Sequence, residues 1–168
     1  MPKFERIKRR HLLKKTEHRD ELERIRDILG SQVGNLGDER FEEGILDDDS
    51  RVLLLDGEIV FWEEEGTLYP TLRALLSGIV DLPEITVDMG AVKFVANGAD
   101  IMAPGVVEID DVVKDGQVVA IVDERHGKPL AVGVATMDAE DMRNTDSGKV
   151  VLSRHHVNDE LWQFGKNR

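Results

Sequence analysis

Histidine and aspartate are the residue types in this sequence that could serve as acids, bases or metal ligands. His155 and His156 are adjacent, so in a strand they would point to opposite faces and could not bind one metal ion as a pair. His126 falls in a loop, where a surface role is the ordinary one. The acidic run 47–49 lacks the alternate spacing and the terminal glutamate of a calcium loop. We therefore expect no metal site, no cofactor and no catalytic residue among them.

Asp88 and Asp100 flank a segment of a different kind, DMGAVKFVANGADIMAPGV at residues 88–106. No nucleophile or second base accompanies either carboxylate, so nothing makes a general base of it. The sequence from Ala99 to Gly105 carries small residues and a Pro-Gly pair, which allow another backbone to come close. This composition indicates a recognition surface and not a reaction centre.

A short helix is predicted at the start of this segment. Its buried face would be formed by four apolar residues spaced at i, i+1, i+3 and i+4: Ala91, Val92, Phe94 and Val95. Lys93 and Asn97 would face away, and Gly98 occupies the position of a helix C′ residue. We expect Phe94 and Met102 to belong to the core and not to a stacking surface.

The stretch GAVKFVANGADIMAPGV resembles the core of a PUA domain, the RNA-binding pseudobarrel of pseudouridine synthases and archaeosine transglycosylases. More narrowly, the chain resembles the malignant T-cell-amplified sequence family of translation factors in its archaeal type. Three further stretches carry this resemblance in family order: EGTLYPTLRALL at Glu65–Leu76, AVGVATMDAEDM at Ala131–Met142 and HHVNDELWQF at His155–Phe164. The resemblance runs from about Leu53 to the C-terminus, and the first fifty residues match loosely.

This resemblance implies an α+β protein, with an N-terminal α/β domain at 1–83 followed by a PUA-type β pseudobarrel at 84–165. It also implies a non-catalytic RNA-binding protein that contacts tRNA or rRNA on the small ribosomal subunit in initiation, re-initiation or recycling. The N-terminal domain would bind a partner resembling density-regulated protein. The residues expected to contact RNA are Lys93, Asn97, Gly98, Ala99, Pro104, Gly105 and Arg154.

Two other functions stay open at this point. PUA modules are often fused to RNA-modifying enzymes, but only about eighty-four residues precede Ile85, too few for such a catalytic domain. The chain could instead be a protein-interaction adaptor that recruits a partner through its N-terminal domain and keeps only vestigial RNA binding. An acidic surface fits the adaptor best.

Charge is distributed unevenly along the chain. The net charge is −12, yet residues 1–26 hold ten basic and five acidic side chains, a balance of +5, which leaves −17 for the remainder. An acidic protein without cysteine suggests, as a hypothesis about its source, an archaeal halophile with a salt-rich cytoplasm. At molar salt the Debye length is only about 3 Å, so RNA binding would depend on shape, hydrogen bonds and stacking.

Neither a membrane span nor a secretory signal is expected. The longest apolar runs, such as Val52–Leu55, are far shorter than a transmembrane helix, and no apolar region follows the charged start MPKFERIKRR. The absence of cysteine excludes disulfides and thiolate metal sites. A cytoplasmic protein is the simplest interpretation.

The N-terminal part should begin with a helix. Thr16 is the expected N-cap, the face of the helix would hold the apolar residues Leu22, Ile25 and Leu29, and Gly30 would end it. The basic residues at 8–15, with Arg24 and Arg26, suggest either a phosphate-binding arm or a solvated face. Residues 31–50 indicate a loop with at most one short element.

A hairpin is the clearest element of this half. RVLLL and EIVFW flank Asp56-Gly57, a type I′ turn signature. A helix should follow with Leu72, Leu75 and Leu76 on its buried face and Pro70 in its first turn. Arg73 could form an interdomain salt bridge or an RNA contact. Pro83 marks the expected domain boundary.

The C-terminal part is predicted to consist of short strands with turns between them, the pattern of a small barrel. The turn 114–116 and the cap Asp138, which would begin a helix ending at Met142, separate some of these strands. The expected strands cover residues 85–87, 106–113, 117–122, 130–136, 150–153 and 161–164.

Overall fold

A computed structural model of the chain describes residues 5–29 and 39–166. The contacts divide the chain into two compact units, residues 1–81 with 160–168 and residues 82–159. The expected α+β class is confirmed, because a helix and an open sheet precede a nearly closed β pseudobarrel. Among the helices in the described ranges, none combines the length and apolar character needed to span a membrane.

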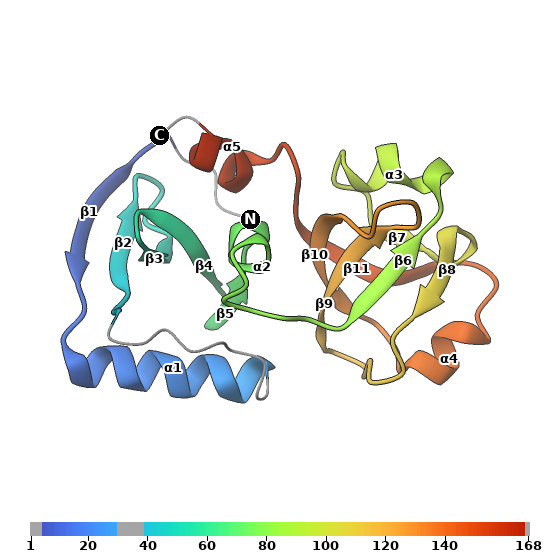
Figure 1. Cartoon of the computed structure of the whole chain (residues 1–168), viewed down its shortest axis with the longest axis horizontal. Coiled ribbons are helices and arrows are strands. Elements are labelled where there is room, and N and C mark those ends of the chain that lie inside the picture. The colour runs from blue at the N-terminus through green and yellow to red at the C-terminus, as the bar shows by residue number, and fades with distance from the viewer. Residues whose placement is uncertain (1–4, 30–38, 167–168) are drawn as a thin grey trace. The chain divides into compact units, whose positions relative to one another are not determined.

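The first unit is a five-stranded antiparallel meander in the order β1-β2-β3-β4-β5, accompanied by three helices (Figure 1). Its elements are β1 Ile7–Leu12, α1 Lys15–Leu29, β2 Glu42–Leu46, β3 Arg51–Leu55, β4 Glu58–Glu64, β5 Thr67–Pro70, α2 Leu72–Leu76 and α5 Glu160–Lys166.

The predicted hairpin is present and forms the centre of this sheet. Asp56 and Gly57 both have positive φ, 53° and 80°, as a type I′ turn requires. The apolar runs 52–55 in β3 and 59–62 in β4 are buried at every position, so both faces of the sheet are covered at its centre. Trp62 is fully buried and stacks on Tyr69 with ring centroids 5.1 Å apart, which ties β4 to β5.

Three details of this unit differ from the expectations. The helix begins at Lys15, so Thr16 lies inside it and is not its N-cap, because the side chain of Glu17 reaches back to accept from the Lys14 N–H at 2.9 Å. Pro70 ends β5, and Thr71 caps α2 by accepting from the Ala74 N–H. Gly30, the expected helix stop, lies outside the described residues.

The largest difference concerns residues 161–164, which form part of helix α5 and not a strand that closes the sheet. A short apolar run does not distinguish a strand from a helix segment. Within this unit Arg73 of α2 places its guanidinium 4.1 Å from the ring centroid of Trp162 and donates to the Trp162 carbonyl oxygen. These contacts account for the polar residue among the leucines of this helix. Leu76 was expected on the buried face with Leu72, but it is 53% exposed, because the helix ends at this residue.

The short element expected within 31–50 is β2, which pairs with the basic strand β1. In β1, Lys8 contacts Asp49 and Arg10 contacts Glu42 at 2.8 Å. Arg51 of β3 lies between three carboxylates, with Glu21 and Glu43 both at 2.6 Å and Glu63 at 3.5 Å. Burial opposes the charge on Arg51, but the hydrogen bonds to Glu43 and Glu21 raise its pKa above the ordinary value.

The second unit is a six-stranded sheet in the order β7-β11-β10-β9-β6-β8, which curls into the pseudobarrel. Its elements are β6 Glu84–Val87, α3 Met89–Val95, β7 Ile101–Met102, a 3-10 turn η1 at Ala103–Gly105, β8 Val106–Ile109, β9 Val118–Asp123, β10 Pro129–Ala135, α4 Ala139–Arg143 and β11 Lys149–His156. The two edge strands, β7 and β8, are consecutive in the chain and are joined by η1. The barrel is therefore open only along this short seam.

The two helices of this unit lie at opposite ends of its barrel (Figure 1). The core between them is apolar and includes Ile85, Ile101, Val119 and Ile121, each at most 1% exposed. β9 and β10 occupy the ranges expected for strands, but both are buried along almost their whole length and do not alternate. The helix after Thr136 is also present, but its N-cap residue Asp138 makes no capping hydrogen bond and accepts instead from the Asp115 N–H at 2.8 Å.

A buried carboxylate closes the loop between β9 and β10. Asp123 accepts from the N–H of His126 at 2.6 Å and from that of Lys128 at 3.2 Å. The hydrogen bond from His126 is the main cause that holds the pKa of Asp123 below its ordinary value, and burial opposes it. This loop also bears on α3, because Glu124 accepts from the Met89 N–H.

Candidate functional site

Helix α3 is the element that positions the predicted recognition residues. Asp88 caps it by accepting from the Ala91 N–H at 2.9 Å, which satisfies one of the donors left unpaired at a helix start. At the other end Gly98 has φ 92°, and the following N–H, that of Ala99, donates to the Phe94 carbonyl at 3.0 Å. The expected glycine end of the helix is therefore confirmed.

His156 of β11 fixes this helix end from the side. A Cβ atom on Gly98 would lie 2.8 Å from the His156 Nε2 atom. The Nδ1 atom of the same ring lies 3.1 Å from the Ala96 carbonyl and 2.6 Å from that of Val157. His155, by contrast, is buried with its Nδ1 atom 2.6 Å from Asp159. The two adjacent histidines therefore have different surroundings, as the strand pattern predicted.

The segment 99–105 after the helix, called the shelf from here on, also lies close to α3. The Asp88 N–H donates to the Gly105 carbonyl at 2.9 Å, and a Cβ atom on Gly105 would lie 3.1 Å from that of Ala91. Small residues were expected to let a second backbone come near. In the structure the atoms that come near these two glycines belong to the protein itself, to His156 at Gly98 and to Ala91 at Gly105.

Two residues expected in the core are exposed, and this corrects the sequence interpretation. Phe94 is 57% exposed and Met102 is 47% exposed. Together with Ala91 and Pro104 they line an apolar pocket of about 380 Å³ between α3 and the shelf, a volume in the range of small-ligand sites. The shelf is therefore open to solvent on the side that faces the helix.

The polar residues predicted on this surface are arranged around the pocket. Lys93 places its ammonium group 5.1 Å from the ring centroid of Phe94. Asn97, Ala99 and Pro104 are exposed, as is Lys93 itself. α3 and the shelf therefore bring the expected residues from Lys93 to Gly105 together along one strip of the surface.

Arg154, the remaining expected residue, comes from β11 and is half-buried. Its positive charge favours the ionised form of Asp100. The Asp100 side chain accepts from the Ser153 N–H at 2.8 Å and lies 3.0 Å from the Lys149 ammonium. Burial opposes ionisation of Asp100, but the Ser153 hydrogen bond and the charges of Lys149 and Arg154 hold its pKa below the ordinary value. This carboxylate is thus ionised and compensated by its neighbours.

The chemistry available on this surface is recognition. An exposed aromatic ring can stack against a planar ring, and an ammonium group beside it can contact an anion. Asp88 and Asp100, the acidic residues of the pocket, are both engaged in hydrogen bonds of the fold. Within the described ranges, no group of three or more potential metal-ligating side chains is present.

Comparison with known proteins identifies the family. The PUA domain matches residues 83–157. A 42% identity over 117 residues relates the chain to an uncharacterised protein of Methanocaldococcus jannaschii, covering 70% of this chain and 72% of that one. Malignant T-cell-amplified sequence 1 of Rattus norvegicus is 40% identical over 117 residues, and the alignment covers 67% of this chain and 64% of the rat protein. The chain belongs to the PUA-domain family of the malignant T-cell-amplified sequence proteins.

Two further relatives extend this result. Translation machinery-associated protein 20 of Schizosaccharomyces pombe is 35% identical over 115 residues, covering 65% of this chain and 63% of the yeast protein. The crystal structure of a PUA domain protein from Aeropyrum pernix matches with a TM-score of 0.81 and 28% identity, covering 94% of this chain and 91% of that one. The alignments to the rat and yeast proteins each span slightly less than two thirds of the relative's length.

Phe94 and Met102 are the site residues that sequence reasoning missed. Phe94 is one position before the buried Val95, so it lies about 100° round the helix from it, at the border of the apolar face. Met102 follows the buried Ile101 in a strand, where successive side chains point to opposite sides. That alternation was the available signal for Met102.

Proposed function

We propose that this chain is a non-catalytic RNA-binding protein of translation. It contacts tRNA or rRNA on the small ribosomal subunit in initiation, re-initiation or recycling. In this proposal residues 1–83 form a pre-PUA domain that binds a partner resembling density-regulated protein, and residues 84–165 form the RNA-binding PUA domain. Membership of the family and the name of its yeast relative, a translation machinery-associated protein, support this.

The observation that carries the proposal is the exposed Phe94 with the Lys93 ammonium beside its ring, at the edge of an apolar pocket. An unpaired base stacks on Phe94 and Met102, and Lys93 contacts the adjoining phosphate. Base–aromatic stacking contributes about 1–3 kcal/mol per base, and it does not depend on a basic surface. This mode of binding therefore suits a protein with a net charge of −12.

The other expected residues have defined parts in this arrangement. Asn97 and Ala99 lie at the exposed end of the helix, where the Asn97 amide can donate to or accept from a base or a ribose. Pro104 continues the apolar surface. Gly98 lets the end of the helix lie against His156, and Gly105 lets the shelf lie against Ala91. Arg154 adds positive charge beside Asp100.

The decisive test is co-sedimentation of the full chain with small ribosomal subunits at physiological salt. The wild-type protein should travel with the subunit, and Lys93→Ala should release it. Lys114→Ala is the matched control, because Lys114 is also exposed but lies before β9, next to Asp115, whose N–H donates to Asp138 at the start of α4. Equal binding of both variants would refute the assignment of the surface.

An adaptor function is the second candidate, and the acidic balance of residues 27–168 favours it. An adaptor would bind the subunit only through a partner protein, so Lys93→Ala would leave the association unchanged while removal of the partner would abolish it. An RNA-modification assay on bulk tRNA addresses the third possibility. Turnover by the purified chain would contradict the proposal that it is not an enzyme.

A further inference from the structure

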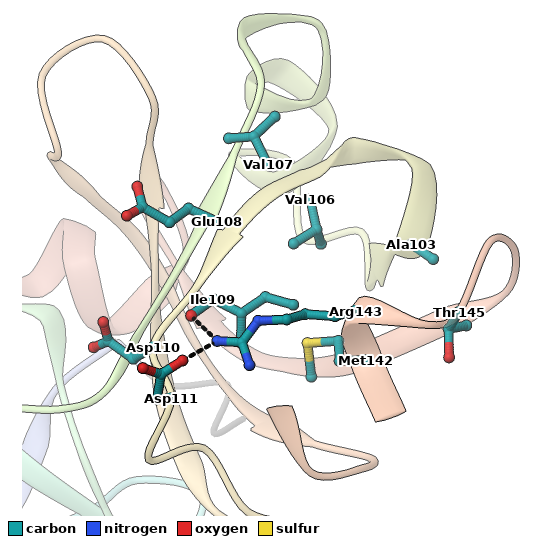
Figure 2. Close-up of a pocket in the computed structure, with 10 residues that line it drawn as sticks. All are labelled: Ala103, Val106, Val107, Glu108, Ile109, Asp110, Asp111, Met142, Arg143 and Thr145. Carbon is teal, nitrogen blue, oxygen red and sulfur yellow. Dashed lines mark hydrogen bonds and ion pairs between the residues drawn. The ribbon is translucent and has the colours of Figure 1, made fainter. Parts of the chain in front are cut away.

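A second groove, of about 540 Å³, lies in the same unit between edge strand β8 and helix α4. Figure 2 shows Arg143 reaching from α4 across this groove to β8, with Met142 and Thr145 beside it and Val106 facing them. Arg143 donates to the Ile109 carbonyl at 2.8 Å and also contacts Asp111. None of the residues proposed to bind RNA lines this groove.

The groove exposes backbone groups of β8. The Asp110 N–H donates to the Glu84 carbonyl at 3.0 Å, and β8 pairs with β6 on that side. Because backbone groups alternate in direction along an antiparallel strand, Ile109 turns its N–H and carbonyl away from β6. Val107 is the extra residue of a β-bulge between two pairs of this ladder, and a bulge leaves its extra residue unpaired, so the Val107 carbonyl is also left without a partner in β6. The contact from Arg143 to the Ile109 carbonyl agrees with this direction. Such an edge is a template for an additional strand.

Arg143 occupies one of these groups and leaves two, the Val107 carbonyl and the Ile109 N–H. In a parallel pair, one residue of the added strand bridges two residues of its neighbour, donating to the first and accepting from the second. The two remaining groups match that pattern. An antiparallel strand would instead need the Ile109 carbonyl, which Arg143 already holds.

The charge around the groove selects the kind of segment that fits. Glu108, Asp110 and Asp111 are exposed along β8 and just after it, and α4 adds the exposed Glu140 and Asp141. Among the residues that line the groove, Arg143 is the single cation, and Asp111 pairs with it. A phosphate backbone would be repelled here, whereas lysine and arginine side chains would be attracted.

We propose that the β8 edge is a docking site for an extended basic segment of a partner protein, which adds to the barrel as a strand parallel to β8. Its backbone pairs with Val107 and Ile109. Its basic side chains lie beside Glu108 and Asp111, and its apolar side chains cover Val107, which is 51% exposed. This is the main-chain mode of peptide recognition used at open sheet edges. It is independent of RNA binding at α3.

The experiment is an NMR titration of the full, isotopically labelled chain with a blocked peptide of about six residues, an ordinary strand length, that alternates lysine with valine. The amide signal of Ile109 should shift and gain protection from exchange. A peptide with glutamate in place of lysine and a uridine oligonucleotide are titrated in parallel. Neither should shift the β8 amides, although the oligonucleotide should shift those of α3.

Two variants with opposite expectations sharpen the test. Glu108→Lys should weaken peptide binding about fivefold, which corresponds to ~1 kcal/mol, and Glu39→Lys in the first unit is the control with the same change of net charge. Arg143→Gln should strengthen binding, because it removes a repelling charge and releases Asp111. Equal affinity of Glu108→Lys and Glu39→Lys, or β8 shifts produced by the oligonucleotide and not by the peptide, would overturn the proposal.

Discussion

The substitution Gly98→Ala tests how the C-terminal end of helix α3 is held in place. Gly98 has φ 92°, a conformation that costs an alanine about 1–2 kcal/mol. The added Cβ atom would also lie 2.8 Å from His156 Nε2 and 3.0 Å from its Cδ2 atom. The His156 ring has little freedom to move away, because its Nδ1 atom lies within hydrogen-bonding distance of the Ala96 and Val157 carbonyls.

These two terms set the expected magnitude. Overpacking against a fixed side chain costs about 1–3 kcal/mol, so strain and crowding together should destabilise the protein by about 2–5 kcal/mol. For a chain of this size, that corresponds to a fall in melting temperature of roughly 4–20 °C. Urea and thermal unfolding of the full chain, followed by circular dichroism, measure both quantities.

Gly90→Ala is the control, because it adds the same single methyl group to the same helix. Gly90 is exposed and has no positive φ, and its Cβ atom would meet only the Asp88 side chain, at 3.3 Å. Alanine is a better helix former than glycine by about 1 kcal/mol. The free energy of unfolding should therefore stay unchanged or rise by up to that amount.

A double-mutant cycle separates the two terms. His156→Ala removes the ring that crowds residue 98 but not the backbone strain, so the combined variant should be more stable than the sum of the single effects predicts, by about 1–3 kcal/mol. Two results would refute the reasoning. One is a Gly98→Ala protein as stable as the wild type, and the other is strict additivity with His156→Ala.

Three further predictions follow from single side chains. Phe94→Ala should weaken binding of single-stranded RNA by about 1–3 kcal/mol, with Phe94→Tyr near wild type in a filter-binding assay, while stability changes by less than about 0.5 kcal/mol because the ring is 57% exposed. Arg51→Ala should lower the free energy of unfolding by about 2–3 kcal/mol, since Glu43 loses its arginine partner while Glu21 and Glu63 keep only Arg24, and urea melts should show a smaller loss at high salt. Asp123 has a lowered pKa in the folded state, so its contribution is present above the ordinary aspartate pKa and is lost as pH falls through the folded value. Acid titration of Asp123→Asn should therefore show a flatter loss of stability below about pH 4, and a slope equal to that of the wild type would contradict this account.

The fold could be predicted from the sequence wherever a local signal decides the structure. Asp56-Gly57 forces positive φ at two successive positions, so the hairpin around it follows from the turn alone. Gly98 similarly marks the end of α3, as expected from its place in the sequence. Asp88, which caps the start of this helix, is also a local signal, but the sequence interpretation did not use it. Residues 161–164 carry no such signal, and their apolar side chains suit a strand and a helix equally well, which is why α5 was predicted wrongly.

The site was less predictable, because its shape depends on contacts between distant parts of the chain. Periodicity indicates which residues share a face, but not how wide a strip the neighbouring elements cover. Phe94 is on the border of that strip, and only the position of the shelf leaves it exposed. The contact between Gly98 and His156 likewise requires the register of β11, which no local pattern specifies.

The acidic charge of the protein and a nucleic-acid function are compatible once the charges are placed. Of the two carboxylates at the α3 pocket, Asp88 is occupied by the helix N-terminus and Asp100 by Ser153 and Lys149. Lys93 has its ammonium over the Phe94 ring. Few counterions are released when a single cation meets RNA, so the slope of log affinity against log salt should be near one, where a basic module with many phosphate contacts shows a far steeper dependence. A steep dependence would indicate that the RNA lies elsewhere, on the basic strand β1, and would return that strand to the role of a phosphate-binding arm.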